Sequence, residues 1–106
     1  MNTQLYSAPI HVAAEDVNIE NIRLLLENTK NKADVNSNNK LGLTAIHILL
    51  GKLVEFAAWQ NKAKNIRPNK MSDEEVDRNI LDIFGSIILV CEQRELRSVL
   101  LAFLIL

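Results

Sequence analysis

The chain has 106 residues, of which 48% are hydrophobic and 24% charged, and its net charge is -1 at pH 7. A chain of this length forms a single domain or a fragment of one, and its composition is typical of a globular protein rather than a disordered one. A net charge so close to zero offers no general attraction to nucleic acid or to an anionic membrane. Cys91 is the only cysteine, which excludes an intrachain disulfide and a cysteine-based metal site.

Two features of the sequence bear on localisation. The opening stretch MNTQLYSAPIHVAAE lacks the basic and long apolar regions of a secretory signal peptide. The apolar runs SIILV and SVLLAFLIL are separated by charged residues, and neither approaches the roughly 20 apolar residues of a membrane span. We therefore expect an intracellular, cytoplasmic protein without a membrane span, and a secreted effector remains an open alternative.

The first predicted elements are two short helices. Pro9 suits the first position of a helix, because its missing N–H would be unpaired there anyway. The residues DVN interrupt this helix, and Ile19, Ile22, Leu25 and Leu26 then restore helical spacing. Two such helices form a hairpin that is too small to bury its own apolar face.

A polar segment, ENTKNKADVNSNNKLGL, comes next and contains five asparagines and Gly42, which tolerate the left-handed backbone of turns. Thr44 occupies the N-cap position of the following helix, AIHILLGKLVEFAAW, whose apolar residues keep the helical period. The basic segment QNKAKNIRPNK ends this helix, since Pro68 disfavours helical geometry for the residue before it. We expect that segment to be a solvated loop rather than a nucleic-acid contact.

The clearest predicted helix lies in MSDEEVDRNILDIFGSIILVCEQ. It opens with a capping box formed by Ser72 and Glu75, which explains the cluster of carboxylates there without an acid/base site. Its apolar stripe comprises Val76, Ile80, Ile83, Phe84, Ile87 and Cys91. Cys91 on this stripe is expected to be an inert core thiol. The last segment, RELRSVLLAFLIL, predicts a closing helix over residues 94–106.

Two tetrapeptides repeat along the chain: APIH, from Ala8 to His11, and TAIH, from Thr44 to His47, with a spacing of 36 residues. This pattern resembles the ankyrin repeat, a unit of about 33 residues with a β-turn and two helices, whose first helix opens with Thr-Pro-Leu-His. The stretch APIHVAAEDVNIENIRLLLENTKNKADVN also matches the family's small-residue pair, its three leucines and its closing Gly-Ala-Asp-Val-Asn box.

The resemblance implies an all-α fold, an ankyrin-type helical-hairpin solenoid with short β-turn fingers. It divides the chain into a first repeat over about residues 7–41 and a degenerate second repeat over about residues 42–92. The second repeat carries an insertion over about residues 55–78, and the closing helix follows it. Val17 stands where the family has a glycine between its helices, so we expect that turn to be strained or differently built.

The resemblance also implies a non-catalytic protein–protein interaction module or scaffold, which binds another protein of unknown identity through turn tips and the first-helix face. The matching positions of the tip and of the helical face are Asn36, Asn38, Asn39 and Lys40, and Glu15, Asp16 and Lys52. An alternative is a capping or oligomerising piece of a larger repeat protein. In that case the apolar run from Leu100 to Leu106 packs on another copy or on further repeats.

His11 and His47 invite a catalytic or metal-binding interpretation. The resemblance instead implies a structural role for both histidines, as for Pro9 and Thr44. It implies that each histidine ring bonds to the capping hydroxyl and to neighbouring backbone. The sequence has no His or Cys pair with ligand spacing and no glycine-rich phosphate loop. We therefore expect no catalytic, cofactor-binding or metal site, and no enzyme.

Overall fold

The computed structural model describes residues 8–28, 30–61 and 64–92. These ranges contain four α-helices and two short 3₁₀ turns, and no strand. The helices are α1 (Pro9–Glu15), α2 (Ile19–Glu27), α3 (Ala45–Asn61) and α4 (Asp73–Cys91), and the turns are η2 (Lys64–Ile66) and η3 (Pro68–Lys70). The all-α part of the predicted fold class is confirmed. The predicted closing helix over residues 94–106 lies outside the described residues.

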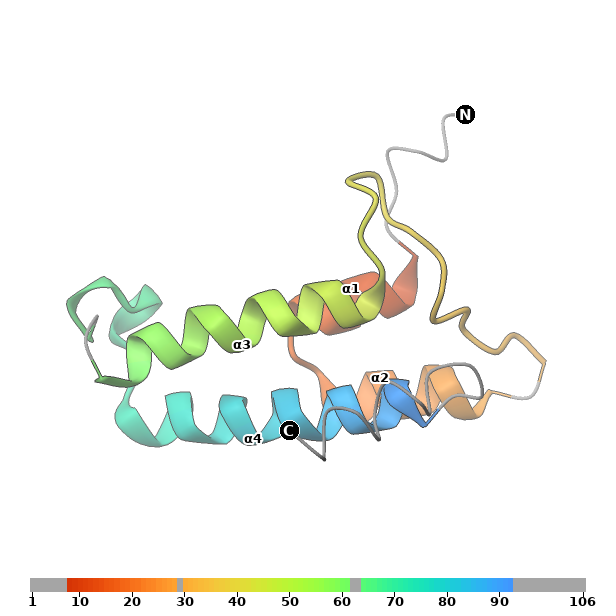
Figure 1. Cartoon of the computed structure of the whole chain (residues 1–106). Helices are drawn as coiled ribbons and strands as arrows, with labels where there is room; N and C mark the ends of the chain where they lie inside the picture. Colours follow the sequence, from red (N-terminus) through yellow and green to blue (C-terminus); the bar gives the residue numbers. More distant parts are fainter. Residues whose placement is uncertain (1–7, 29, 62–63, 93–106) are drawn as a thin grey trace.

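The four helices form two hairpins that lie side by side (Figure 1). Helix α1 packs on α3, and α2 packs on α4, so the first helices form one layer and the second helices form the other. The segment that leads from α2 to α3 rises away from the helices as a projecting finger, which we define as residues 33–43.

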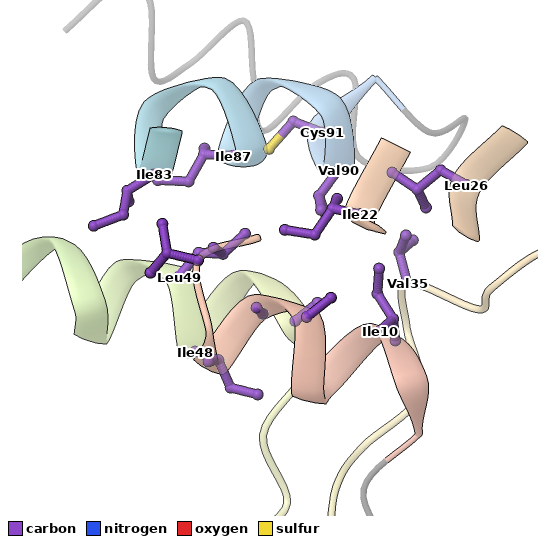
Figure 2. Close-up of a cluster of buried hydrophobic side chains, with 14 of the residues drawn as sticks. Ile10, Ile22, Leu26, Val35, Ile48, Leu49, Ile83, Ile87, Val90 and Cys91 are labelled. Carbon is purple, nitrogen blue, oxygen red and sulfur yellow. The ribbon is translucent and has the colours of Figure 1, made fainter. Parts of the chain in front are cut away.

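The core lies where the two hairpins meet (Figure 2). Ile10 of α1, Ile22 of α2, Leu49 of α3 and Ile83 of α4 are each at most 1% exposed. Val35, at the base of the finger, joins the same cluster and is 7% exposed. Burial of these side chains is the main stabilising term of such a small domain, and Val35 fixes the finger to it.

Helix α4 follows its predicted start closely. Ser72 Oγ accepts from the Glu75 N–H at 3.1 Å, and a Glu75 carboxylate oxygen accepts from the Ser72 N–H at 3.3 Å, so the predicted capping box is confirmed. The predicted apolar stripe is only partly buried, because Phe84 is 38% exposed whereas Val76 and Ile83 are fully buried. Val90, which the predicted stripe did not include, is also fully buried. Gly85 allows close contact with α2, since a Cβ there would lie 2.7 Å from Ile19 Cδ1.

The turn between α1 and α2 is built on a left-handed residue. Val17 has φ +51°, and the N–H groups of Val17 and Asn18 donate to the carbonyls of Ala14 and Ala13. This bonding pattern is a Schellman motif, which normally places glycine at the left-handed position. For a β-branched residue the backbone conformation costs about 1–2 kcal/mol. The strain expected at Val17 is therefore confirmed, and the 6% exposure of its side chain offsets part of that cost.

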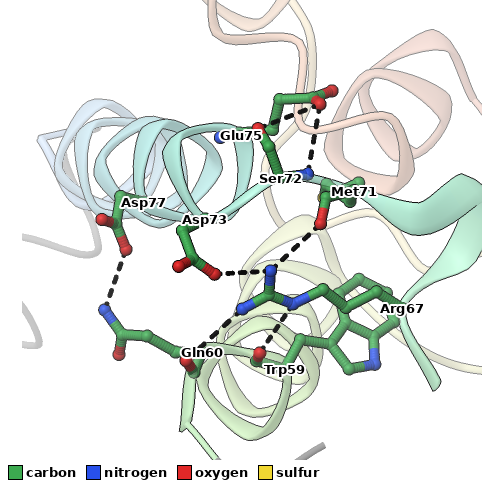
Figure 3. A network of polar contacts seen from close by, with 8 residues as sticks. All are labelled: Trp59, Gln60, Arg67, Met71, Ser72, Asp73, Glu75 and Asp77. Carbon is green, nitrogen blue, oxygen red and sulfur yellow. Dashed lines mark hydrogen bonds and ion pairs between the residues drawn. The ribbon is translucent and has the colours of Figure 1, made fainter. Parts of the chain in front are cut away.

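The connection between α3 and α4 is organised by Arg67, whose side chain is only 5% exposed (Figure 3). Its guanidinium donates to the carbonyl oxygens of Trp59 and Met71 at 2.8 and 3.0 Å and to the Asp73 carboxylate at 2.7 Å. A longer contact of 3.4 Å reaches the Gln60 carbonyl. The end of α3 and the start of α4 are thereby joined through one side chain, and the expectation of a merely solvated loop was wrong at Arg67.

The proposed division into repeats remains a prediction. Residues 55–78 contain the end of α3, both 3₁₀ turns and the start of α4. We propose that an insertion in this range lengthens both helices of the second hairpin instead of adding a separate unit.

Candidate interaction surface

The base of the finger is a turn around Asp34. The Asp34 carboxylate accepts from the Asn36 N–H at 2.9 Å, and its carbonyl accepts from the Ser37 N–H at 3.2 Å. Asp34 and Asn36 are exposed, and Val35 between them points into the core. This alternation anchors the finger and leaves the polar side of its base accessible.

The tip of the finger is held by Asn39. Its side-chain oxygen accepts from the N–H groups of Leu41 and Leu43 at 2.9 and 3.0 Å, and its own N–H donates to the Leu43 carbonyl at 2.9 Å. Gly42 completes the turn with φ +81°. Asn39 therefore shapes the tip, while the neighbouring Asn38 and Lys40 are exposed.

The sequence interpretation missed two leucines on the finger. Leu41 at the tip is 73% exposed, and Leu43 is 37% exposed. The signal was available, since an apolar residue inside the run NNKLGL has no helical face to join. Single exposed leucines are common on protein surfaces, but Leu41 projects from an ordered turn beside two exposed polar residues.

His11 fastens α1 to the finger. The residue is 1% exposed, its Nδ1 accepts from the Ala8 N–H at 3.0 Å, and its Nε2 donates to the Ser37 carbonyl at 2.9 Å. These roles follow because a backbone N–H can only donate and a carbonyl can only accept. The two bonds satisfy a free N–H at the start of α1 and fix the finger against it.

His47 has the same local geometry at the start of α3. Its Nδ1 lies 2.8 Å from Thr44 Oγ1 and 3.1 Å from Thr44 N, so Nδ1 accepts from both groups. His47 is exposed, and its Nε2 bonds to no residue in the part of the chain that the structure describes. The ring thus caps α3 and leaves one polar atom open to solvent.

A groove of about 300 Å³ opens between α1 and α3 next to the finger. It is lined by Glu15, Leu43, His47, Ile48, Gly51, Lys52 and Glu55. The Lys52 ammonium lies 3.8 Å from the Glu15 carboxylate and 3.4 Å from the Glu55 carboxylate. The structure therefore brings together Glu15 and Lys52, and it adds Glu55, which sequence reasoning did not single out.

Asp16 belongs to a different surface. It follows the last residue of α1 and lines a hollow of about 530 Å³ between α1 and α2, together with the apolar residues Val12 and Leu24. The groove and this hollow have no lining residue in common. Sequence reasoning had placed Asp16 on the same face as Glu15 and Lys52. The structure separates Asp16 from them, because adjacent positions on a helix point about 100° apart.

The candidates for chemistry among the residues that the structure describes are Cys91 and the potential metal ligands. Burial raises the pKa of the Cys91 thiol, which is 1% exposed, and this disfavours the reactive thiolate. Within residues 8–28, 30–61 and 64–92, no group of three or more His, Cys, Asp or Glu side chains could hold a metal ion. In the same ranges, no helix has the length and apolar character needed to cross a membrane.

Two stacked helical hairpins joined by a projecting finger define a helical repeat protein. Residues 10–62, half of the chain, match the family model described as ankyrin repeats in many copies. The chain belongs to the ankyrin repeat family, which confirms the resemblance and the helical-hairpin solenoid fold. Members of this family are generally protein–protein interaction modules and typically non-catalytic. No curated protein and no solved structure matches the chain.

Proposed function

We propose that this chain is a non-catalytic module that binds another protein through its finger tip and through the groove between α1 and α3. The observation that carries this proposal is the groove itself. It opens between the first helices of the two hairpins and is lined by Glu15, His47 and Lys52, side chains that the core does not need. The finger contributes Leu43 to the lining of the groove, which supports treating the finger tip and the groove as one binding surface.

The chemistry of this surface favours a partner with mixed apolar and polar character. Leu41 offers an apolar contact at the tip, flanked by Lys40 and Asn38. In the groove, Lys52 is held between two carboxylates, so the surface presents a fixed pattern of both charge signs. Such a pattern gives specificity and register more than bulk affinity. Interfaces of this kind typically gain most of their free energy from a few apolar or aromatic anchors, and Leu41 fits that role.

The test uses a partner captured with the unmodified chain, purified, and titrated against variants by calorimetry. We expect Leu41→Ser combined with Lys40→Glu to weaken binding by at least about tenfold, because both side chains lie at the tip and contribute nothing to the core. Lys52→Glu should weaken binding by a similar factor, since it places three carboxylates together in the groove.

The control is Arg78→Glu, an equal change of charge at an exposed position of α4. It should leave the affinity unchanged within about twofold. Unchanged affinity in the Lys40/Leu41 and Lys52 variants, with circular dichroism showing intact helices, would place the binding surface elsewhere.

A further inference from the structure

Gly51 is a glycine that the fold of the chain does not explain. The chain has three glycines. Gly42 adopts φ +81° in the turn of the finger, and a Cβ at Gly85 would lie 2.7 Å from Ile19 Cδ1. Beyond its chain neighbours and its own helix backbone, a Cβ at Gly51 would meet no atom of the described residues within 4 Å. Gly51 also has the backbone conformation of a helix, so neither conformation nor packing requires a glycine there.

This glycine lowers the stability of α3. The helix extends from Ala45 to Asn61, so Gly51 lies well inside it. Glycine in the interior of a helix is less favourable than alanine, because its backbone loses more conformational freedom on folding. In α3 this loss is offset by no contact among the described residues, since the space above Gly51 is open.

Gly51 lines the groove between α1 and α3, and it lies between two polar side chains. His47, Gly51 and Glu55 are spaced four residues apart, so they form one row along α3, and all three line the groove. The row is about 12 Å long, with a gap at Gly51. In the first hairpin the position 36 residues earlier is Glu15, whose carboxylate reaches the Lys52 ammonium. The α1 side of the groove therefore carries a side chain where the α3 side has none.

The two polar side chains of the row offer opposite hydrogen-bonding groups. His47 Nδ1 accepts from the Thr44 N–H, so the neutral ring carries its proton on Nε2, which is a donor. This Nε2–H has no partner in the part of the chain that the structure describes. The Glu55 carboxylate is an acceptor with several sites, and the Lys52 ammonium contacts it at 3.4 Å. Along the groove, the row thus presents a donor, a gap and an acceptor.

We propose that an extended segment of the protein partner lies along this row, with its main chain in contact with α3 at Gly51. The contact rests on the function proposed above and specifies which part of the partner enters the groove. An extended main chain carries carbonyl and N–H groups along its length, which match the donor of His47 and the acceptor of Glu55. About four extended residues cover the row. Glycine allows the closest approach of another main chain to a helix, because it has no Cβ.

The first test separates the stability of the chain from its affinity. Gly51→Ala should raise the thermal unfolding midpoint by about 3–6 °C, because alanine favours the helix and its Cβ enters open space. The same variant should bind the captured partner at least about tenfold more weakly, because the methyl group holds the partner's main chain away from α3. Scanning and titration calorimetry measure the two effects. Unchanged affinity would overturn the inference, and so would a loss of stability, which would show that the fold needs this glycine.

The matched control is Ala57→Gly, the reverse exchange at an exposed position on a different side of α3. It should lower the midpoint by a similar amount and leave the affinity unchanged within about twofold, since Ala57 does not line the groove.

The Lys52→Glu variant separates this inference from the proposed function. If Lys52→Glu weakens binding and Gly51→Ala does not, the partner uses the groove without a close contact at Gly51, and only this inference fails. If neither variant weakens binding, the proposed use of the groove fails with it.

The second test asks whether an extended segment is the occupant, and it uses short overlapping synthetic peptides that cover the sequence of the captured partner. At least one peptide should bind the chain by itself, and Gly51→Ala should weaken that binding by a similar factor. Binding of the whole partner but of no peptide would assign the groove to a folded surface and overturn the inference. An alanine scan of the binding peptide checks the main-chain contact. If truncation of one peptide side chain restores binding to Gly51→Ala, that side chain fills the gap, which also contradicts the proposal.

Discussion

The two hairpins open with nearly the same tetrapeptide, yet their histidines end in different surroundings. His11 is buried and joins the start of α1 to the finger through Ser37. His47 makes the same local cap with Thr44 but is exposed, and no finger in the described residues reaches its Nε2. The tetrapeptide motif by itself therefore determines only the hydrogen bond between the histidine ring and the backbone at the start of the helix. Its long-range bond depends on the segment that follows the hairpin.

The largest expected effect separates these two histidines. His11→Ala removes a buried ring and leaves the Ala8 N–H and the Ser37 carbonyl without their partner, which should cost about 2–4 kcal/mol of unfolding free energy. His47→Ala should cost about 1 kcal/mol or less, since its surroundings are open to water. Urea denaturation followed by circular dichroism measures both values. Equal losses would show that burial of His11 does not decide its role.

The connections within the two hairpins also differ. The first is a tight turn at the left-handed residue Val17, whereas the second is held by the side chain of Arg67, so a substitution of Arg67 tests this difference. Arg67→Ala should destabilise the chain by about 2–3 kcal/mol, because it leaves two carbonyls and a carboxylate without their buried donor. Arg67→Lys should recover little, since an ammonium cannot reproduce the planar array of donors. Chemical denaturation gives the values, with the exposed Arg78→Ala as control. A loss below about 0.5 kcal/mol for Arg67→Ala would assign the connection to packing alone.

The smallest expected effect concerns the left-handed turn of the first hairpin. Val17→Gly and Val17→Ala both remove the buried side chain, but only glycine adopts φ +51° without strain. The glycine variant should therefore be more stable than the alanine variant by about 0.5–1 kcal/mol. At Val12, an exposed position inside α1, the order should reverse by a similar amount. Paired denaturation curves measure both differences, and the same order at both positions would contradict the strain at Val17.

The helix starts could be predicted because their signals are local. Pro9 begins α1 and the Ser72–Glu75 box begins α4, as expected from neighbouring residues alone. The left-handed turn at Val17 was equally accessible, because the resemblance placed a glycine there.

Features that depend on distant contacts could not be predicted in the same way. Arg67 is buried because the ends of α3 and α4 supply acceptors around it, and no sequence pattern shows that these ends meet. Asp16 faces the hollow between α1 and α2 because of the exact rotation of α1, which the motif leaves open. Phe84 belongs to the predicted apolar stripe of α4 but is 38% exposed, because periodicity shows which residues share a helix face and not which of them a neighbouring element covers.

The candidate surface was predictable in part. The motif located the finger and the first-helix face, and the structure unites Glu15 with Lys52 in one groove. At the tip, the side chain of Asn39, a predicted binding residue, accepts hydrogen bonds from the backbone of the finger and so shapes the turn. Leu41, which was not predicted, is the exposed apolar side chain there. Whether these residues bind a partner remains a proposal.

The proposed function is tested most directly by nuclear magnetic resonance of the isotope-labelled chain with its captured partner. We expect the largest amide shift changes at residues 38–43 of the finger and at Glu15, Lys52 and Glu55 of the groove, with small changes along α2. Changes concentrated on α2 and α4, with the finger and the groove unaffected, would contradict the account.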